Sequence, residues 1–421
     1  MNERSVSVNG ISIYSLTNPN LRSFCLSLYV RAGSIFEDSS NNGISHLFEH
    51  VVFRNIKNKY ENFYELLAMH GLCFQGSTYK KFVSFTIDGP QHEFDFAIEI
   101  LCGLFDEIKL TSHDFNNEKG RIKAEIREKD RRSSLDFYFD SIVWKNSEVE
   151  KIVLGYCKTI DRVSVKKINE FRQKVLSAGN CFVYATGNIS DENLDALNKK
   201  ISKLDISQSN PGFTNTVTVN NEFFHREKKI WIKNNYWHYI QIGFDVDCSK
   251  YPGGVYDLLY ALLFNGDKAL VYNYLSEDNP IIYSYDSTFE QYDNVGNINF
   301  SFEVDRNKIE DVFKTVVELL NAAKDGRFNF EANLNYEMFN WELDLDNPDN
   351  LNWNMAYYNH ILKTQPIDYS DEFYGRFRVT KEQIIDAAKY IFRRCNMTVA
   401  VKGDRKKINT EAIEKILESL D

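Results

Sequence analysis

A segment of 26 residues occurs twice in this chain of 421 residues, and the second copy starts 216 positions after the first. The copies read RVSVKKINEFRQKVLSAGNCFVYATG from Arg162 and RVTKEQIIDAAKYIFRRCNMTVAVKG from Arg378. An Arg, a Val, an Ile, an Asn and a Gly recur at the same places in both. Such a constant offset indicates duplication of a folding unit of about 210 residues.

Both copies carry local signals for a helix followed by a strand. Ser164 and Thr380 stand where a helix N-cap belongs, and Thr380 forms a capping-box pattern with Gln383. In each copy an Asn and a short apolar run follow the helical segment, and such a run is typical of a buried strand.

The rest of the chain fits two units of this kind. Runs at 24–30 and 82–87 indicate strands, and the apolar residues over 94–108 have helical spacing. We therefore predict the α+β class, with two homologous domains that are each a mainly antiparallel sheet covered by helices. The expected divisions are a first domain at 1–205, a linker at 206–222 that contains Asn-Pro-Gly, and a second domain at 223–421.

The composition bears on which partners the protein can bind and on the cell compartment in which it is expected. A formal charge of −10 and a pI near 5.5 argue against nucleic acid, which requires a concentrated basic surface. No apolar run approaches the roughly 18 residues of a membrane span, and the first residues show no signal-peptide layout. Seven scattered cysteines form no CxxC pair. They indicate reduced thiols, and we expect a cytoplasmic protein.

Two of the eight histidines fall within the stretch GISHLFEHVVF, four positions apart. On a helix, His46 and His50 project from one face and can share a metal ion such as zinc. Glu49 lies on the same side, where its carboxylate can serve as a general base toward a metal-bound water. The order HxxEH is the inverzincin pattern. The alternative is an amphipathic helix with half-buried histidines.

A catalytic zinc usually takes a third protein ligand and leaves one position to water. The segment at 115–132 offers Glu118 and Glu125, which are seven residues apart and so share one helical face. From these residues alone, a charged and solvated helix is the alternative interpretation.

This set of residues resembles the pitrilysin family of zinc peptidases, which includes insulin-degrading enzyme and the mitochondrial processing peptidases. The family motif is HxxEH with a glutamate ligand about 75 residues later, and Glu125 stands 75 residues after His50. A glutamate seven residues before that ligand supports the family's site, and Glu118 matches it. VNGISIYS, LYVRAGSIFEDSSNNGISHLFEH and HGLCFQGST follow the family's first-domain order. The resemblance implies a zinc endopeptidase whose Zn²⁺ is held by His46, His50 and Glu125, with Glu49 as the catalytic base.

The chain departs from the family at its substrate-binding positions. After HGLCF the family usually has Asn-Ala on an edge strand that pairs with the peptide, and here Gln75 and Gly76 stand there. The resemblance implies that they bind substrate by strand addition. The family's second domain carries an Arg and, seven residues later, a Tyr that both bind substrate. Tyr283 matches the Tyr, but Ser276 replaces the Arg. An ordinary strand aromatic is the alternative for Tyr283.

The second half carries no zinc set. The offset of 216 places Leu262, Asn265, Gly266 and Trp341 opposite the three ligands and the base, so we expect a non-metal copy.

The missing arginine implies a partner. We expect a clamshell dimer, and specifically a heterodimer with a paralogous subunit that supplies Arg and Tyr. Two-chain bacterial members of the family process leader peptides of ribosomally made modified peptides, with subtilosin-type bacteriocin maturation as the model, and this gives the expected peptide substrate. A non-catalytic scaffold or a peptide-binding subunit of a processing complex remains the alternative.

Overall fold

The computed structural model describes residues 2–132, 134–209, 212–213, 230–363, 366–367 and 377–420. The chain forms two compact units, each assembled from three segments. Unit 1 contains Met1–Arg132, Glu148–Asn215 and Leu343–Ser370, and unit 2 contains Ser133–Ser147, Thr216–Glu342 and Asp371–Asp421. These units differ from the division expected from the sequence, because each half of the chain contributes one segment to the other unit. Most of the predicted linker at 206–222 lies outside the described residues.

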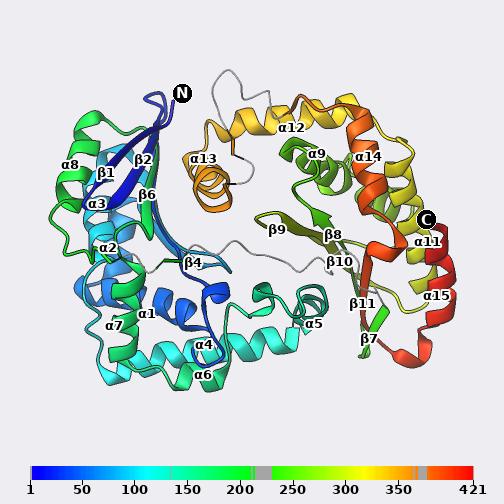
Figure 1. Ribbon diagram of the computed structural model, residues 1–421, viewed down its shortest axis with the longest axis horizontal. Helices are drawn as coiled ribbons and strands as arrows, with labels where there is room; N and C mark the ends of the chain where they lie inside the picture. The colour runs from blue at the N-terminus through cyan, green and yellow to red at the C-terminus, as the bar shows by residue number, and fades with distance from the viewer. Residues whose placement is uncertain are drawn as a thin grey trace. The chain divides into compact units, whose positions relative to one another are not determined.

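Unit 1 is built on a six-stranded sheet with the order β1-β2-β6-β3-β5-β4 (Figure 1). Neighbouring strands are antiparallel except β2 and β6, which are parallel. The apolar strands β3 and β6 are buried along almost their whole length, so both faces of the sheet need a cover. The strands are β1 Arg4–Val8, β2 Ile11–Thr17, β3 Ser23–Val30, β4 Cys73–Thr78, β5 Val83–Pro90 and β6 Cys181–Gly187.

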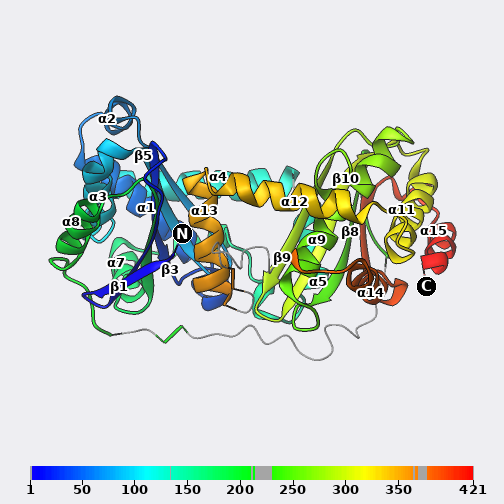
Figure 2. The same ribbon diagram turned by 90° about the horizontal axis from the view of Figure 1, so that it is seen from above.

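The helices of unit 1 cover both faces of this sheet. Most of them lie on one face, and α13 (Pro348–Met355) lies on the other, against β3 and β6 (Figures 1 and 2). The remaining helices are α1 Ile44–Lys59, α2 Phe63–His70, α3 Phe94–Gly103, α4 Ser112–Arg132, α6 Cys157–Asp161, α7 Val165–Val175 and α8 Asp191–Ile201.

Unit 2 repeats the arrangement with a five-stranded sheet in the order β7-β11-β8-β10-β9. Here too the neighbouring strands are antiparallel except for one pair, β7 and β11. This order matches β2-β6-β3-β5-β4 strand for strand, as a duplicated unit requires. The strands are β7 Ile230–Asn234, β8 His238–Asp247, β9 Tyr285–Tyr292, β10 Val295–Val304 and β11 Met397–Gly403.

One face of the second sheet is covered by a layer that contains α9, α11 and α14, and α5 (Ser134–Val143) packs against β8 and β11 on the other (Figure 1). The helices of this unit besides α5 are α9 Gly253–Phe264, α10 Leu270–Tyr272, α11 Ile309–Lys324, α12 Phe330–Asp344, α14 Lys381–Ile391 and α15 Thr410–Leu417.

The two segments that cross the expected boundary carry equivalent helices. Adding the offset of 216 to α5 gives residues 350–359, which overlap α13. Each half of the chain thus sends one helix to the other half's sheet, on the face opposite the main layer of helices. The periodicity of a short helix does not reveal which sheet it covers, so the sequence could not show this exchange.

Several local expectations are confirmed. Ser164 caps α7, and Thr380 and Gln383 form a reciprocal capping box at the start of α14. The helix expected over 94–108 was too long, since α3 ends at Gly103 and the chain turns there. Among the described helices, none combines the length and apolar character that a membrane span requires.

Candidate metal centre

The helix that carries HxxEH begins at a buried acidic cap. The Glu37 carboxylate accepts hydrogen bonds from the backbone N–H groups of Gly43 and Ser45, at 2.7 and 2.8 Å. These N–H groups have no partner inside the helix, and an anion there also interacts favourably with the helix dipole. The cap fixes the first turn of α1, in which His46 lies.

His46 and His50 lie one turn apart on α1, with ring centres 4.6 Å apart. His46 is 8% exposed and His50 is half-buried. Glu125 from α4 reaches His46, with 3.1 Å between its Oε2 and the His46 Nε2. One donor atom from each of His46, His50 and Glu125 lies within 4.8 Å of the other two. The structure therefore brings together the three residues that the sequence predicts as ligands.

Glu118 lies behind His50 and is 2% exposed. Its Oε2 is 3.6 Å from the His50 Nδ1, and its Oε1 lies 3.9 Å from Arg54 and 3.6 Å from Arg121. Arg54 is held in turn by Asp114 at 2.6 Å. A carboxylate in this position can orient an imidazole ligand and raise its basicity.

The electrostatics of the cluster fit a cation. Burial lowers the pKa of His46, but the nearby carboxylates of Glu125 and Glu49 outweigh it and raise this pKa to about 9. The buried Nδ1 of His46 is 3.5 Å from Glu49 and makes no hydrogen bond within the described part of the chain. Zinc prefers imidazole nitrogens and carboxylate oxygens as donors, and both are present here. The nearby carboxylates also favour a positive charge at this place.

Glu49 is positioned by β4, the edge strand of the sheet. The Thr78 hydroxyl donates a hydrogen bond of 2.8 Å to the Glu49 Oε2. Burial raises the pKa of Glu49, but His46, His50 and Thr78 together lower it below its ordinary value. A Cβ on Gly76 would lie 2.9 Å from the Glu49 Cγ and Oε1. The absence of a side chain at Gly76 therefore makes room for this carboxylate.

Comparison with known proteins identifies the family of the chain. The model for Insulinase (Peptidase family M16) matches residues 13–155, and the model for the Peptidase M16 inactive domain matches residues 162–332. The chain belongs to peptidase family M16. This pitrilysin-type family uses zinc, and the candidate ligands His46, His50 and Glu125 lie within the part matched by the first model.

Relatives agree with this assignment. The zinc protease YmxG of Bacillus subtilis is 21% identical over 332 residues, which are 77% of this chain and 79% of that protein. The β subunit of the mitochondrial-processing peptidase of Saccharomyces cerevisiae is 24% identical over 190 residues, 44% of this chain and 41% of that protein. A protease from Helicobacter pylori has the same fold, with a TM-score of 0.81 and 18% identity over 96% of this chain and 99% of that one.

The substrate-side residues predicted in the first M16 domain lie on β4. Gln75 is exposed, and its amide contacts the Cys73 Sγ at 3.4 Å. Gly76 lies next to it, opposite Phe85 of β5. Only one side of β4 is paired within its sheet, so its other edge can accept an extended peptide.

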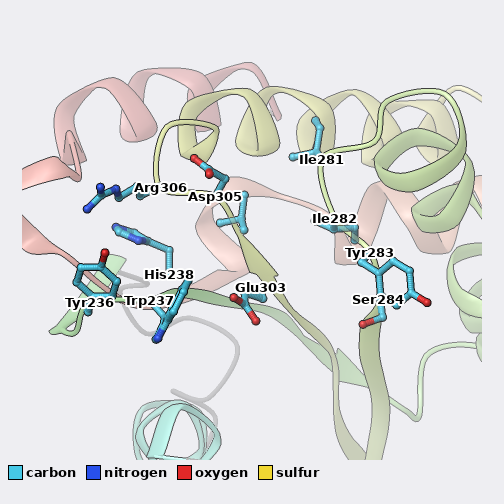
Figure 3. Close-up of a pocket in the computed structure, with 11 residues that line it drawn as sticks. Tyr236, Trp237, His238, Ile281, Ile282, Tyr283, Ser284, Glu303, Asp305 and Arg306 are labelled. Atoms are coloured by element: carbon cyan, nitrogen blue, oxygen red, sulfur yellow. The ribbon is translucent and has the colours of Figure 1, made fainter.

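Tyr283 is the one residue of the second M16 domain that the sequence predicts to bind substrate. Tyr283 is not a strand aromatic: it lies in the loop before β9 with its side chain 97% exposed. It lines a cavity of about 530 Å³, but Ser276, in the short helix Asn273–Glu277, does not. Arg306 lines the same cavity, and Figure 3 shows it at the opposite end from Tyr283. No arginine stands beside Tyr283 among the residues that line this cavity.

Sequence reasoning missed Thr78, Glu37 and Arg54. Thr78 lies two residues beyond Gly76 on the strand, and alternation along a strand places both on one face. That spacing could have indicated a residue that touches the base. Glu37 and Arg54 act through contacts with other elements, and no short-range pattern marks them.

Proposed function

We propose that this chain is a zinc-dependent endopeptidase in which His46, His50 and Glu125 hold the metal. The observation that supports this proposal is the convergence of these three donors within 4.8 Å, beside a carboxylate from the same helix. Glu118 supports His50 from behind, and Glu49 acts as the catalytic base.

The chain's own groups account for the proton transfers of peptide hydrolysis. Bound zinc supplies a Lewis acid that polarises the peptide carbonyl and acidifies water. Thr78 engages the Oε2 of Glu49, which leaves Oε1 to take the proton from the attacking water. The same oxygen then delivers that proton to the leaving amine. Gln75 and Gly76 hold the peptide along the edge of β4.

The test of peptidase activity is Glu49→Gln. The amide cannot accept a proton, so cleavage of quenched fluorescent peptides should fall by about 100- to 10,000-fold while zinc content stays at the parent level. Glu318→Gln removes the same charge from an exposed position on α11 and should change neither quantity. Turnover that survives in Glu49→Gln would place the base elsewhere.

We further propose that full activity requires a second, paralogous chain. This rests on Ser276, whose short neutral side chain cannot replace a guanidinium and its fork of donors. Loss of one such stabilising group costs about 100- to 1000-fold in rate. The proposed assembly is a cytoplasmic clamshell heterodimer, and leader peptides of modified peptides or bacteriocins are the proposed substrates.

Mixing the chain with its paralogue tests the assembly. The zinc-loaded chain alone should cleave leader peptides slowly, and addition of a paralogue that carries Arg and Tyr should raise the rate by about 100-fold or more. Full activity of the single chain would contradict the heterodimer. Absence of cleavage in both states, with zinc bound, would favour a scaffold or peptide-binding subunit.

A further inference from the structure

Unit 2 contains a cavity with an unusual combination of exposed aromatic and charged side chains. It lies where β8 and β9 begin and β10 ends, and its volume is about 530 Å³. A volume of this order is typical of sites for small ligands or single side chains of a peptide. The lining is Tyr236, Trp237, His238, Ile281, Ile282, Tyr283, Ser284, Glu303, Val304, Asp305 and Arg306.

Three aromatic side chains in this cavity are exposed. Tyr236 is 65% exposed, Trp237 is 59% exposed and Tyr283 is 97% exposed. Clustered exposed aromatics leave a large apolar area in water and are typical of binding sites. The flat face of an indole or phenol ring also attracts a cation.

Glu303 supplies a carboxylate between two of these rings. In Figure 3 it lies between Trp237 on one side and Tyr283 with Ser284 on the other. Its backbone pairs with Tyr239 in the sheet, whereas its carboxylate forms no hydrogen bond or ion pair with any residue that the structure describes. The carboxylate is therefore available to a ligand.

The lining as a whole is negative. Arg306 lies over the ring of Tyr236 at 5.6 Å, at the far end of the cavity, and is adjacent in sequence to Asp305. Burial lowers the pKa of His238, and its Nε2 accepts a hydrogen bond of 3.1 Å from the Asp404 N–H. With His238 neutral, the charged groups of the lining are the carboxylates of Glu303 and Asp305 and the guanidinium of Arg306. The chain's formal charge of −10 also attracts cationic peptides.

We propose that this cavity binds an arginine side chain of the peptide substrate. The guanidinium stacks on Trp237 and donates a bidentate pair of hydrogen bonds to Glu303, while Ile282 contacts the aliphatic stem. Arginine fits better than lysine because its planar group can stack and form two parallel hydrogen bonds at once. The inference rests on the proposed peptidase function, since it names a feature of the substrate.

A pair of matched peptides tests the site. One contains a single arginine and its twin contains citrulline, which has nearly the same shape but no charge. Binding is measured by calorimetry to the zinc-loaded full chain with Glu49→Gln, which keeps the peptides intact. The arginine peptide should bind about tenfold more tightly, because it gains both stacking and an ion pair.

Variants of the cavity locate that preference. Glu303→Gln should reduce the arginine preference to about twofold or less, because the ion pair is lost, whereas Glu318→Gln should retain it in full. Trp237→Leu keeps an apolar side chain but removes the ring face, and should lower the preference without touching Glu303. It serves as the second variant if Glu303→Gln fails to fold.

Three binding results would bear directly on the proposed arginine site. Equal binding of the two twins, or a preference that survives both Glu303→Gln and Trp237→Leu, would overturn the site. Tighter binding of a third twin with glutamate in place of arginine would also overturn it, since Arg306 would then select an anion. An arginine preference in a chain that never cleaves peptides would refute the peptidase proposal and leave this binding site standing.

Discussion

The two units share the order of five strands but differ in the clusters of polar side chains that they hold. In unit 1, α1 and α4 gather the imidazoles and carboxylates of the metal centre. In unit 2, the loop that follows α9 and the helix α12 bring together Asn265, Lys268, Asn333 and Glu337. The Asn265 amide donates to Glu337 at 3.2 Å, and the Lys268 amine donates to Asn333 at 2.8 Å.

The difference lies in where the positive charge comes from. Burial lowers the pKa of Lys268 and raises that of Glu337, but each charge counteracts the shift in the other. The positive charge in the cluster of unit 2 is thus the Lys268 amine, which is part of the chain itself. Unit 1 has acidic groups around two imidazoles and fits a cation from solution. One scaffold can therefore hold a polar cluster that is closed within the protein, or one that takes a metal.

Replacing a proposed zinc ligand should have the largest effect of the changes considered. His50→Ala removes one of three ligands, so the zinc content should fall from about one per chain to near zero and cleavage should disappear. Elemental analysis and a peptidase assay measure the two effects. The matched control is His113→Ala, an exposed histidine on α4 that contacts Asn117. Parent-like zinc binding in His50→Ala would refute the ligand assignment.

Glu118→Ala should have the next largest effect. It removes the carboxylate beside His50, and metal affinity or activity should fall by about 10- to 100-fold. A zinc-chelator competition titration measures the affinity. Glu170→Ala, an exposed change on α7, is the control. An unchanged metal affinity and activity would mean that Glu118 serves only the fold.

Thr78→Val tests how β4 orients the base. Loss of the hydrogen bond to Glu49 should lower kcat by about tenfold at constant KM and zinc content, because a bond to a carboxylate is stronger than a neutral one. Thr78→Ser keeps the hydroxyl and should restore most of the rate. A Val variant as fast as the parent would leave Thr78 without a role in positioning.

The exchanged helices give a smaller effect, on stability. Asn352 of α13 is fully buried, accepts from the Tyr29 hydroxyl at 2.9 Å and donates to the Tyr184 carbonyl at 3.0 Å. Asn352→Ala should destabilise unit 1 by about 2–3 kcal/mol, because it strands buried polar groups. Trp144→Phe, which removes the bond to Glu290 in unit 2, should cost about 1 kcal/mol. Hydrogen exchange reports on each unit separately, and faster exchange in unit 2 than in unit 1 for Asn352→Ala would contradict the assignment.

The smallest effect concerns Asp88 of β5, whose counterpart in the strand register of unit 2 is Glu303. Burial, together with the charge of Asp349, raises the pKa of Asp88 to about 6. The unfolded chain releases this proton near pH 4, so native stability falls as the pH rises from about 4 to about 6. Asp88→Asn should therefore gain about 1 kcal/mol relative to the parent on going from about pH 5 to about pH 7.5. Denaturant unfolding at both values measures it, and a pH-independent difference would contradict the shift.

The residues alone predict the duplication, the helix caps and the pairing of His46 and His50 on one helical face. The caps follow from short-range rules, and the pairing follows from spacing along one helix, since HxxEH places two imidazoles on one face of α1. In the same way, the interval of seven places Glu118 and Glu125 on one face of α4. The prediction that Glu125 of α4 joins the two histidines of α1 came from the family resemblance. The spacing of residues within one helix cannot show where a second helix lies.

Three features could be found only in the folded chain: the exchange of α5 and α13, the contact of Thr78 with Glu49, and the cavity that Glu303 shares with Trp237 and Tyr283. Each of these depends on which surfaces bury against each other. Burial is a property of the whole fold, since an apolar face in the sequence specifies that it must be covered but not what covers it. The position of Arg306 makes the same point. Sequence spacing showed only that no arginine stands seven residues before Tyr283, whereas the folded chain brings one to the far end of the same cavity.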